Sequence, residues 1–173
     1  MKIIILGYMG AGKSTIGKNL ANNLGLNFID LDDFIIQKES LSIKDIFNTK
    51  GELYFRKVER KYLSEIMQSP NDFILSVGGG TPCYGDNLNL INENENSRSI
   101  YLKGSIPFLA IRLFNEKEQR PLIAHLKDMD QLTEFLGKHL FERNQFYNKA
   151  DQTIVIDNKS ISEITEEIKA TLI

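Results

Sequence analysis

Residues Gly7 to Ser14 read G-Y-M-G-A-G-K-S, a match to the phosphate-loop pattern G-x-x-x-x-G-K-[ST]. In this pattern the glycines let backbone N–H groups turn toward a phosphate, the lysine reaches the β and γ oxygens, and the last hydroxyl can bind Mg²⁺. An apolar run precedes the motif and a helix-like stretch follows it, which is the context that the motif requires. A plain glycine turn would not need Lys followed by Ser. We therefore predict a nucleotide site made of Gly10, Ala11, Gly12, Lys13, Ser14 and Thr15.

Two aspartates follow the second apolar run, in Phe28-Ile29-Asp30-Leu31-Asp32. Residues two apart on an extended chain face the same side, and ligands of open α/β sheets bind at the carboxyl ends of the strands. One carboxylate could hold Mg²⁺, and the other could orient a hydroxyl for attack on the γ-phosphate. Asp32 and Asp33 could equally cap the helical stretch that begins there, and the pattern leaves both roles open. With an ordinary pKa, Asp32 would mainly orient the hydroxyl, since it would be a weak base.

The third apolar run, 73–77, ends in Ser76 and Val77, where many phosphate-loop enzymes place an aspartate for the metal. This favours Asp30 and Asp32 as the source of the metal carboxylate. Three glycines, 78–80, come next, and their bare backbone can approach a ligand closely. A flexible turn before Pro82 is the alternative.

Three arginines are candidates for binding anions. Arg56 lies between Glu52 and Glu59 on a predicted helix, Arg120 ends the polar segment 115–120, and Arg143 lies on a later helix. Each alone fits an exposed charge, and an exposed helix pair is worth only a few tenths of a kcal/mol. Beside a phosphate loop they could clamp a carboxylate or a transferring phosphoryl group. Because the segment before Arg120 has no apolar residue, we expect a mobile surface loop there.

Short apolar runs alternate with amphipathic stretches along the chain, which predicts βαβ units and a parallel sheet covered on both faces. The 173 residues fit one domain over 1–173. The predicted strands are 2–6, 27–30, 73–77, 99–102 and 153–156. The predicted helices are 14–24, 31–38, 52–68, 105–114, 128–148 and 160–172.

Composition narrows the class of protein. The net charge of −2 and pI of about 5.8 give no basic field for nucleic acid. The amino-terminal apolar run is too short for a signal sequence or membrane span. The single cysteine, Cys83, fits a reducing compartment. We therefore expect a cytoplasmic protein without membrane partners. His125 and His139 show no metal-binding pattern and are expected at the surface.

Two other functions share part of this pattern. Residues 148–151, N-K-A-D, resemble the guanine-reading motif of GTP-binding switches, but they follow a helix instead of a strand and no D-x-x-G occurs in the chain. A kinase for a nucleoside monophosphate or for gluconate would share the phosphate loop and a mobile lid. It would not account together for Arg56, the three glycines and Arg143.

In their order and spacing, G-Y-M-G-A-G-K-S-T, D-L-D, F-R-K-V-E, G-G-G, R-P-L-I and R-N-Q-F-Y resemble the shikimate kinase family over nearly the whole chain. The resemblance implies a P-loop kinase fold with a five-stranded parallel sheet, a mobile lid near 115–124 and a substrate-binding region near 31–60. It implies ATP-dependent phosphorylation of the 3-hydroxyl of shikimate, on the route to chorismate and the aromatic amino acids. It also implies a monomer whose small-molecule partners are shikimate and ATP, with Mg²⁺ as cofactor.

The resemblance carries site residues over by matching position. Catalysis would fall to Asp32, Lys13 and Arg120, the last two holding the phosphates. Shikimate would be bound by Asp32, Arg56, Gly79 and Arg143. Ser14 would bind Mg²⁺ with Asp30 close by through water, and Arg112 would lie against the adenine beside the loop 157–159. Tyr8 stands where the family usually has Phe.

Overall fold

A single sheet of parallel strands forms the centre of the molecule. The computed structural model describes residues 1–120 and 122–172, and its five strands run in the order β2-β3-β1-β4-β5, all pairs parallel. Every residue of the central strand β1 is buried, as expected for a parallel strand with neighbours on both sides. The predicted strands are confirmed, with ends that differ by two residues at most. Their bounds are β1 Lys2–Gly7, β2 Asn27–Asp30, β3 Phe73–Ser76, β4 Ser97–Lys103 and β5 Gln152–Val155.

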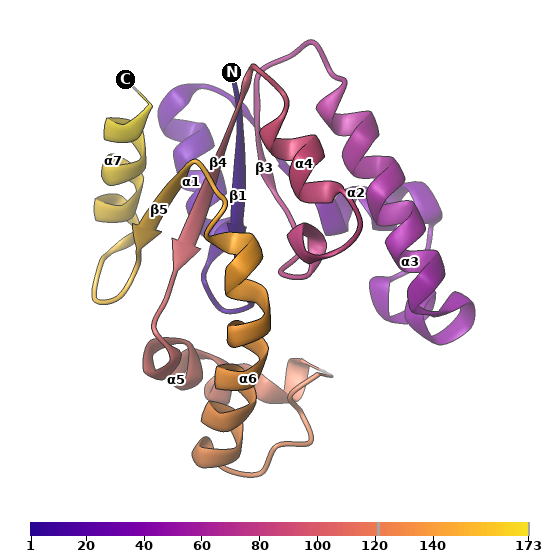
Figure 1. The fold of residues 1–173 in the computed structure, drawn as a ribbon, viewed down its shortest axis with the longest axis vertical. Coiled ribbons are helices and arrows are strands. Elements are labelled where there is room, and N and C mark those ends of the chain that lie inside the picture. The colour runs from indigo at the N-terminus through magenta and orange to yellow at the C-terminus, as the bar shows by residue number, and fades with distance from the viewer. Residues whose placement is uncertain (121, 173) are drawn as a thin grey trace.

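Helices cover both faces of this sheet. In the view of Figure 1, α1 lies behind the strands and α4 in front of them. The helices are α1 Lys13–Leu24, α2 Leu31–Glu39, α3 Ile43–Met67, α4 Asn87–Asn92, α5 Ile106–Glu116, α6 Met129–Tyr147 and α7 Ile161–Thr171, with short 3-10 turns at Thr81–Cys83 and Lys117–Gln119.

Two helical pieces were not predicted. The helix α3 begins at Ile43, nine residues before the predicted start at 52, and Gly51 interrupts it with φ 81° and ψ 171°. The predicted helix is therefore the second part of α3. The other piece, α4, is six residues long, and three of them are Asn, a weak helix former.

Close packing at Gly17 sets the position of α1 against the sheet. A Cβ at Gly17 would lie 2.5 Å from Cε2 of Phe28 and 3.2 Å from Cδ1 of Ile5. Only a residue without a side chain lets the helix approach this closely. The amino end of α1 is thereby held at the carboxyl edge of β1.

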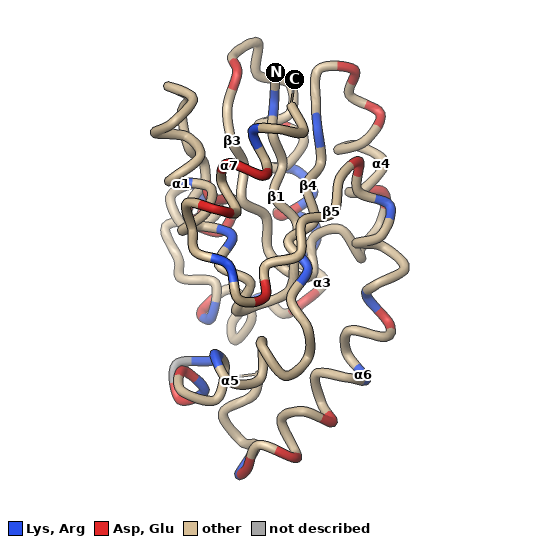
Figure 2. Tube along the Cα trace, turned by 90° about the vertical axis from the view of Figure 1, so that its left-hand side faces the viewer, with Lys and Arg blue, Asp and Glu red and all other residues tan. Residues whose placement is uncertain are grey.

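The carboxyl ends of all five strands meet at one edge of the sheet, the lower edge in Figure 1, and α5 and α6 extend beyond that edge. In Figure 2, Lys and Arg are spread over many elements and are mixed with Asp and Glu. Within the described residues, no helix combines the length and the apolar character needed to cross a membrane.

Candidate active site

The phosphate loop joins β1 to α1 at the carboxyl edge of the sheet. Gly10 and Gly12 have φ of 80° and 84°, in the left-handed region that favours glycine, and Gly12 is the N-cap of α1. The Nζ of Lys13 donates to the carbonyl oxygens of Gly7 and Tyr8 at 2.9 and 3.1 Å. Burial lowers the pKa of Lys13 to about 8, although the carboxylates of Asp32 and Asp30 act in the opposite direction. The loop therefore presents a lysine and a helix amino terminus to one space.

Ser14 and Asp30, which the sequence predicted beside the metal, lie within hydrogen-bond distance of each other. The Ser14 hydroxyl donates to Oδ2 of Asp30 at 2.7 Å, and Oγ of Ser76 lies 3.5 Å from Oγ of Ser14. The end of β3 thus brings a hydroxyl, not a carboxylate, to this point. Hydroxyl and carboxylate oxygens suit Mg²⁺. Across the part of the chain that the structure describes, no group of three or more His, Cys, Asp or Glu side chains is placed to hold a metal, so an ion here would depend on phosphate and water oxygens as well.

Asp32 lies in the first turn of α2 and is half-buried. The helix cap is Asp30, whose Oδ1 accepts from the backbone N–H of Asp32 at 3.1 Å, so the capping alternative for Asp32 is wrong. The expected ordinary pKa is also wrong. Burial, followed by the charges of Asp30 and Glu59, raises the pKa of Asp32 to about 6, against the opposing effect of Lys13. A carboxylate with this pKa is a better proton acceptor than the sequence suggested.

One cavity of about 550 Å³ joins most of the predicted site residues. Ala11, by contrast, is fully buried and can contribute only its backbone. The predicted residues that line the cavity are Gly10, Gly12, Lys13, Ser14, Thr15, Asp30, Asp32, Gly79, Arg112 and Arg120. Residues that line it but that the sequence did not single out are Met9, Ile16, Glu116, Ile161 and Ile164. Ile161 and Ile164 belong to the apolar face of α7, which periodicity predicted without indicating that its amino end would reach a site.

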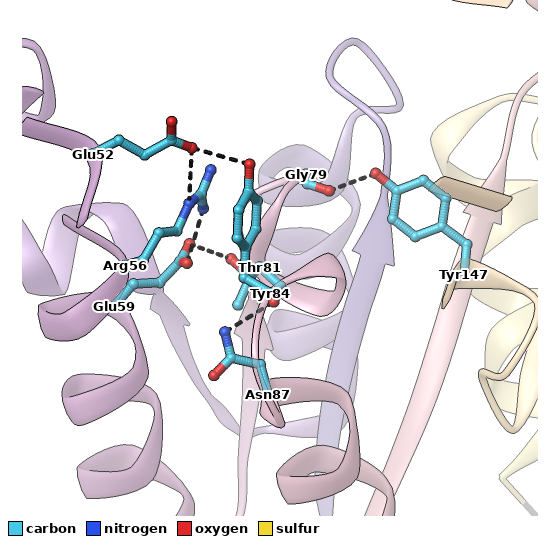
Figure 3. Close-up of polar contacts among 8 residues, drawn as sticks. All are labelled: Glu52, Arg56, Glu59, Gly79, Thr81, Tyr84, Asn87 and Tyr147. Carbon is cyan, nitrogen blue, oxygen red and sulfur yellow. Dashed lines mark hydrogen bonds and ion pairs between the residues drawn. The ribbon is translucent and has the colours of Figure 1, made fainter. Parts of the chain in front are cut away.

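Arg56 is beside this cavity but does not line it. Its guanidinium donates from Nη1 to Oε2 of Glu59 at 2.9 Å, and its Nε lies 3.5 Å from Oε1 of Glu52 (Figure 3). A Cβ at Gly80 would lie 3.0 Å from Nη2 of Arg56, so the guanidinium rests against the glycine segment. Arg56 lines a second cavity, of about 350 Å³, together with Glu52 and Tyr84. The alternative of an exposed ion pair is wrong for the pair of Arg56 with Glu59, because the side chain of Glu59 is only 1% exposed.

Gly79 and Arg143 come from opposite sides to the same region. The Tyr147 hydroxyl donates to the carbonyl of Gly79 at 2.5 Å (Figure 3), which ties the glycine segment to α6. A Cβ at Gly79 would lie 3.4 Å from the carbonyl oxygen of Gly7 and 3.5 Å from the amide of Met9. Arg143, half-buried, has its Cζ 5.7 Å from the centre of the Tyr8 ring. Burial raises the pKa of the Cys83 thiol, and the charges of Arg143 and Arg56 oppose the rise.

Arg120 lines the main cavity and is paired in this structure. Its Nη2 donates to Oε2 of Glu116 at 2.6 Å, and its buried Nε has no hydrogen-bond partner among the described residues. The expectation of an anchorless polar loop needs correction. Residues 115 and 116 complete α5, and Ile123 is fully buried, so the predicted lid is anchored on both sides of Arg120. Pro121, within the predicted lid, lies outside the described residues.

Arg112 lies at the entrance of the phosphate loop. Its Nη1 donates to the carbonyl of Gly10 at 3.2 Å, and its Cζ lies 4.5 Å from the centre of the Phe108 ring. Lys159, from the loop before α7, lines the same cavity. These two cations and the apolar amino end of α7 line the same cavity as Asp32.

His139 was expected at the surface, and this prediction is wrong. It is half-buried, and its Nδ1 lies 2.6 Å from the hydroxyl of Tyr8, with which it shares a hydrogen bond. Burial, together with the charge of Arg143, lowers the pKa of His139. The signal in the sequence was the position of His139, four residues before Arg143 and so on the same helix face. His125 is exposed, as predicted.

The N-K-A-D segment has a structural role. Oδ2 of Asp151 accepts from the backbone N–H and the hydroxyl of Ser99 at 2.8 and 3.0 Å. Asp151 precedes β5, so it lies at the amino edge of the sheet, opposite the phosphate loop. A guanine-reading segment must lie on the side of the nucleotide, and this one does not.

Comparison with known proteins agrees with the geometry. The family model described as "Shikimate kinase" matches residues 9–173. A shikimate kinase of Flavobacterium johnsoniae is 46% identical over 167 residues, which are 96% of each chain. The crystal structure of shikimate kinase from Bacteroides thetaiotaomicron has a TM-score of 0.89 at 33% identity and covers 99% of this chain and 98% of its own. Shikimate kinase from Acinetobacter baumannii in complex with shikimate has a TM-score of 0.85 at 28% identity, with 99% and 92% covered. The chain belongs to the shikimate kinase family.

Proposed function

We propose that this chain transfers the γ-phosphate of ATP to the 3-hydroxyl of shikimate, giving shikimate 3-phosphate and ADP on the route to the aromatic amino acids. The observation that carries the proposal is that Asp32 shares one cavity with Lys13, Gly79 and Arg120. A hydroxyl acceptor, a phosphate-binding lysine and a second phosphate-binding cation must meet at one point for in-line transfer. Membership of the family gives the acceptor its identity.

Asp32 orients the acceptor hydroxyl and takes its proton. Its pKa of about 6 leaves most of the group ionised at neutral pH and still able to accept a proton as the bond to phosphorus forms. Lys13 and Arg120 supply positive charge to the phosphoryl oxygens, where charge stabilisation is the main source of catalysis. Arg56 and Arg143 suit the ring carboxylate of shikimate because a guanidinium can bind a carboxylate with two parallel hydrogen bonds.

Mg²⁺ is the metal that this site fits. The Ser14 hydroxyl would bind it, and Asp30, which accepts from that hydroxyl, would hold it through water. When bound, the ion neutralises part of the phosphate charge. ATP would place its adenine near Arg112 and Lys159.

Closure of the segment 115–124 over the substrates would exclude water, which otherwise competes as a nucleophile. We take the enzyme to act as a monomer in the cytoplasm, without nucleic-acid or membrane partners. Light scattering of the purified chain tests the oligomeric state.

The test of function is an assay that couples ADP release to NADH oxidation, with shikimate as acceptor and MgATP as donor. Shikimate 3-phosphate should form, and mass spectrometry should find one added phosphoryl group. Gluconate and AMP serve as alternative acceptors and GTP as alternative donor. A higher kcat/KM for gluconate or AMP would replace the proposal, and so would a folded, ATP-binding preparation that does not phosphorylate shikimate.

A further inference from the structure

The guanidinium of Arg56 is held by two carboxylates of different character. Glu59 is 1% exposed, accepts from Nη1 at 2.9 Å, and has its other oxygen bound by the hydroxyl of the buried Thr81 at 2.7 Å (Figure 3). Glu52 has a side chain that is 55% exposed, and its Oε1 lies 3.5 Å from Nε of Arg56 without forming a hydrogen bond. Glu59 is thus a fixed partner of Arg56, whereas Glu52 is a loose one.

These contacts leave one edge of the guanidinium without a hydrogen bond among the described residues. Nη1 is taken by Glu59, and the buried Nε has no hydrogen-bond partner in the described part of the chain. Nε and Nη2 together form the side-on edge of a guanidinium, which can hold a carboxylate with two parallel hydrogen bonds. An anionic ligand would therefore bind Arg56 at the edge that Glu52 faces.

Tyr84 contacts both Arg56 and Glu52. Its ring centre lies 3.7 Å from Cζ of Arg56, the distance of a stacked cation–π pair. Its hydroxyl donates to Oε1 of Glu52 at 3.0 Å, and this is the same oxygen that stands 3.5 Å from Nε. In Figure 3 the ring stands next to the guanidinium, between α3 and the segment that carries Gly79. Tyr84 follows the 3-10 turn Thr81–Cys83 and belongs to none of the motifs read from the sequence.

We propose that Tyr84 is a positioning residue for Arg56: its ring fixes the plane of the guanidinium, and its hydroxyl holds Glu52 off the edge that binds the substrate carboxylate. The inference rests on the proposed function, in which Arg56 binds the carboxylate of shikimate. Without the ring, the guanidinium would be fixed by Glu59 alone and could turn about that contact. Without the hydroxyl, Glu52 would close on Nε and compete with the substrate for it.

Steady-state kinetics of five variants, with shikimate and ATP varied in turn, test this role: Tyr84→Leu and Tyr84→Phe, Glu52→Gln, and the two Tyr84 changes combined with Glu52→Gln. Tyr84→Leu should raise the KM for shikimate about 2- to 30-fold, the range that a lost cation–π contact gives. Tyr84→Phe keeps the ring and should raise it about 2- to 5-fold, the effect of a partly exposed ion pair. In the background of Glu52→Gln, Tyr84→Phe should have no effect, whereas Tyr84→Leu should keep its effect. The KM for ATP and kcat should hold in all of them, which a general structural defect would not allow.

Tyr54→Leu is the matched control. Tyr54 lies on α3, and its ring centre is 4.4 Å from Nζ of Lys50. Its hydroxyl donates to Oε2 of Glu39 at 2.6 Å. Tyr54 thus has the same kinds of contact as Tyr84, but with partners other than Arg56. Its loss should leave the KM for shikimate unchanged.

Arg56→Lys separates failure of the inference from failure of the proposed function. If Arg56→Lys raises the KM for shikimate while Tyr84→Leu leaves it unchanged, Tyr84 does not position Arg56. If Tyr84→Phe raises it equally with Glu52 and with Gln at that position, the hydroxyl does not restrain Glu52. If Arg56→Lys itself has no effect, the carboxylate role of Arg56 is wrong and the proposed function loses that element. If Tyr84→Leu does not fold, the comparison of Tyr84→Phe in the two backgrounds decides.

Discussion

The carboxylate of Asp30 accepts a hydrogen bond from the backbone N–H of Asp32 at 3.1 Å, and this bond caps α2. Asp30 also accepts from the Ser14 hydroxyl at 2.7 Å, so both of its oxygens are used. Asp32 is thereby freed from the cap, and its carboxylate lines the cavity. The two aspartates therefore differ in place: Asp30 builds the start of α2, and Asp32 is left facing the cavity.

Asp32→Asn should abolish most of the activity without loss of fold. The amide keeps the shape of the side chain but cannot take a proton, so kcat should fall about 10²- to 10⁴-fold, the usual contribution of a general base. The melting temperature should stay near that of the unmodified chain, because the cap is Asp30. Asp33→Asn, an exposed neighbour, is the control and should retain kcat. Normal turnover by folded Asp32→Asn would remove Asp32 from the mechanism.

Asp30→Ala should affect stability and metal use together. Loss of the cap should lower the free energy of unfolding by about 0.5–2 kcal/mol. Loss of the carboxylate beside Ser14 should raise the Mg²⁺ concentration needed for half-maximal activity. Urea denaturation and a Mg²⁺ titration at saturating ATP measure the two effects. Asp30→Asn, which can still cap the helix, should keep most of the stability but should need a higher Mg²⁺ concentration, as Asp30→Ala does. An unchanged Mg²⁺ titration in both variants would contradict the metal role.

Arg143→Ala should weaken shikimate binding and leave ATP binding nearly unchanged. Removing one partner of a buried, hydrogen-bonded charge pair costs about 2–5 kcal/mol, far more than an exposed pair. Calorimetric titration of the variant with shikimate and, separately, with ATP gives both affinities. Lys138→Ala, on the same helix with a side chain that is 75% exposed, is the control. Equal loss of both affinities would point to a structural role for Arg143 instead.

Glu39 should make the fold sensitive to acid. Hydrogen bonds from the Tyr54 and Tyr62 hydroxyls, both 2.6 Å, lower the pKa of Glu39 to about 2. Because the folded pKa lies below the unfolded value of about 4.3, the stabilisation is complete above that value and is lost as the pH falls toward 2. Urea denaturation between pH 7 and pH 2.5 should therefore show a loss of stability that is smaller in Glu39→Gln. Equal pH dependence in the two proteins would show that Glu39 titrates normally.

The sequence predicted the sheet, the phosphate loop and most of the cavity because these depend on local signals. Apolar runs predicted the strands, and the motif fixes the order and spacing of Gly12, which needs a left-handed backbone, and of the side chains of Lys13 and Ser14. What it could not predict depends on contacts between distant segments. The pKa of Asp32 is raised mainly by burial and, after Asp30, by the charge of Glu59, 27 positions away, and Tyr84 reaches Arg56 across a turn with no motif. Burial and partner choice arise only when the chain is folded, and neither has a fixed spacing.

Arg120 gives the sharpest test of the lid. In this structure its guanidinium is paired with Glu116 at 2.6 Å, so the proposed function requires that it exchange that partner for phosphate oxygens. Glu116 has a side chain that is 52% exposed and can return to water when Arg120 leaves it, so the exchange costs little. The energy of Arg120 should therefore appear mainly in the transition state.

Arg120→Ala should lower kcat about 10³- to 10⁵-fold, by analogy with arginine fingers, and leave the affinity of the free enzyme for shikimate nearly unchanged. Arg120→Lys restores the charge without the planar fork and should recover only part of the rate. Hydrogen exchange provides a second measurement: amides of residues 117–120, which follow the end of α5, should exchange rapidly in the free protein and slowly with ADP and shikimate bound. Ile123 is buried while its neighbours on both sides are exposed, so its amide should be protected in both states and serves as the internal reference. Full activity of Arg120→Ala, or a segment already protected without ligand, would exclude the lid from the mechanism.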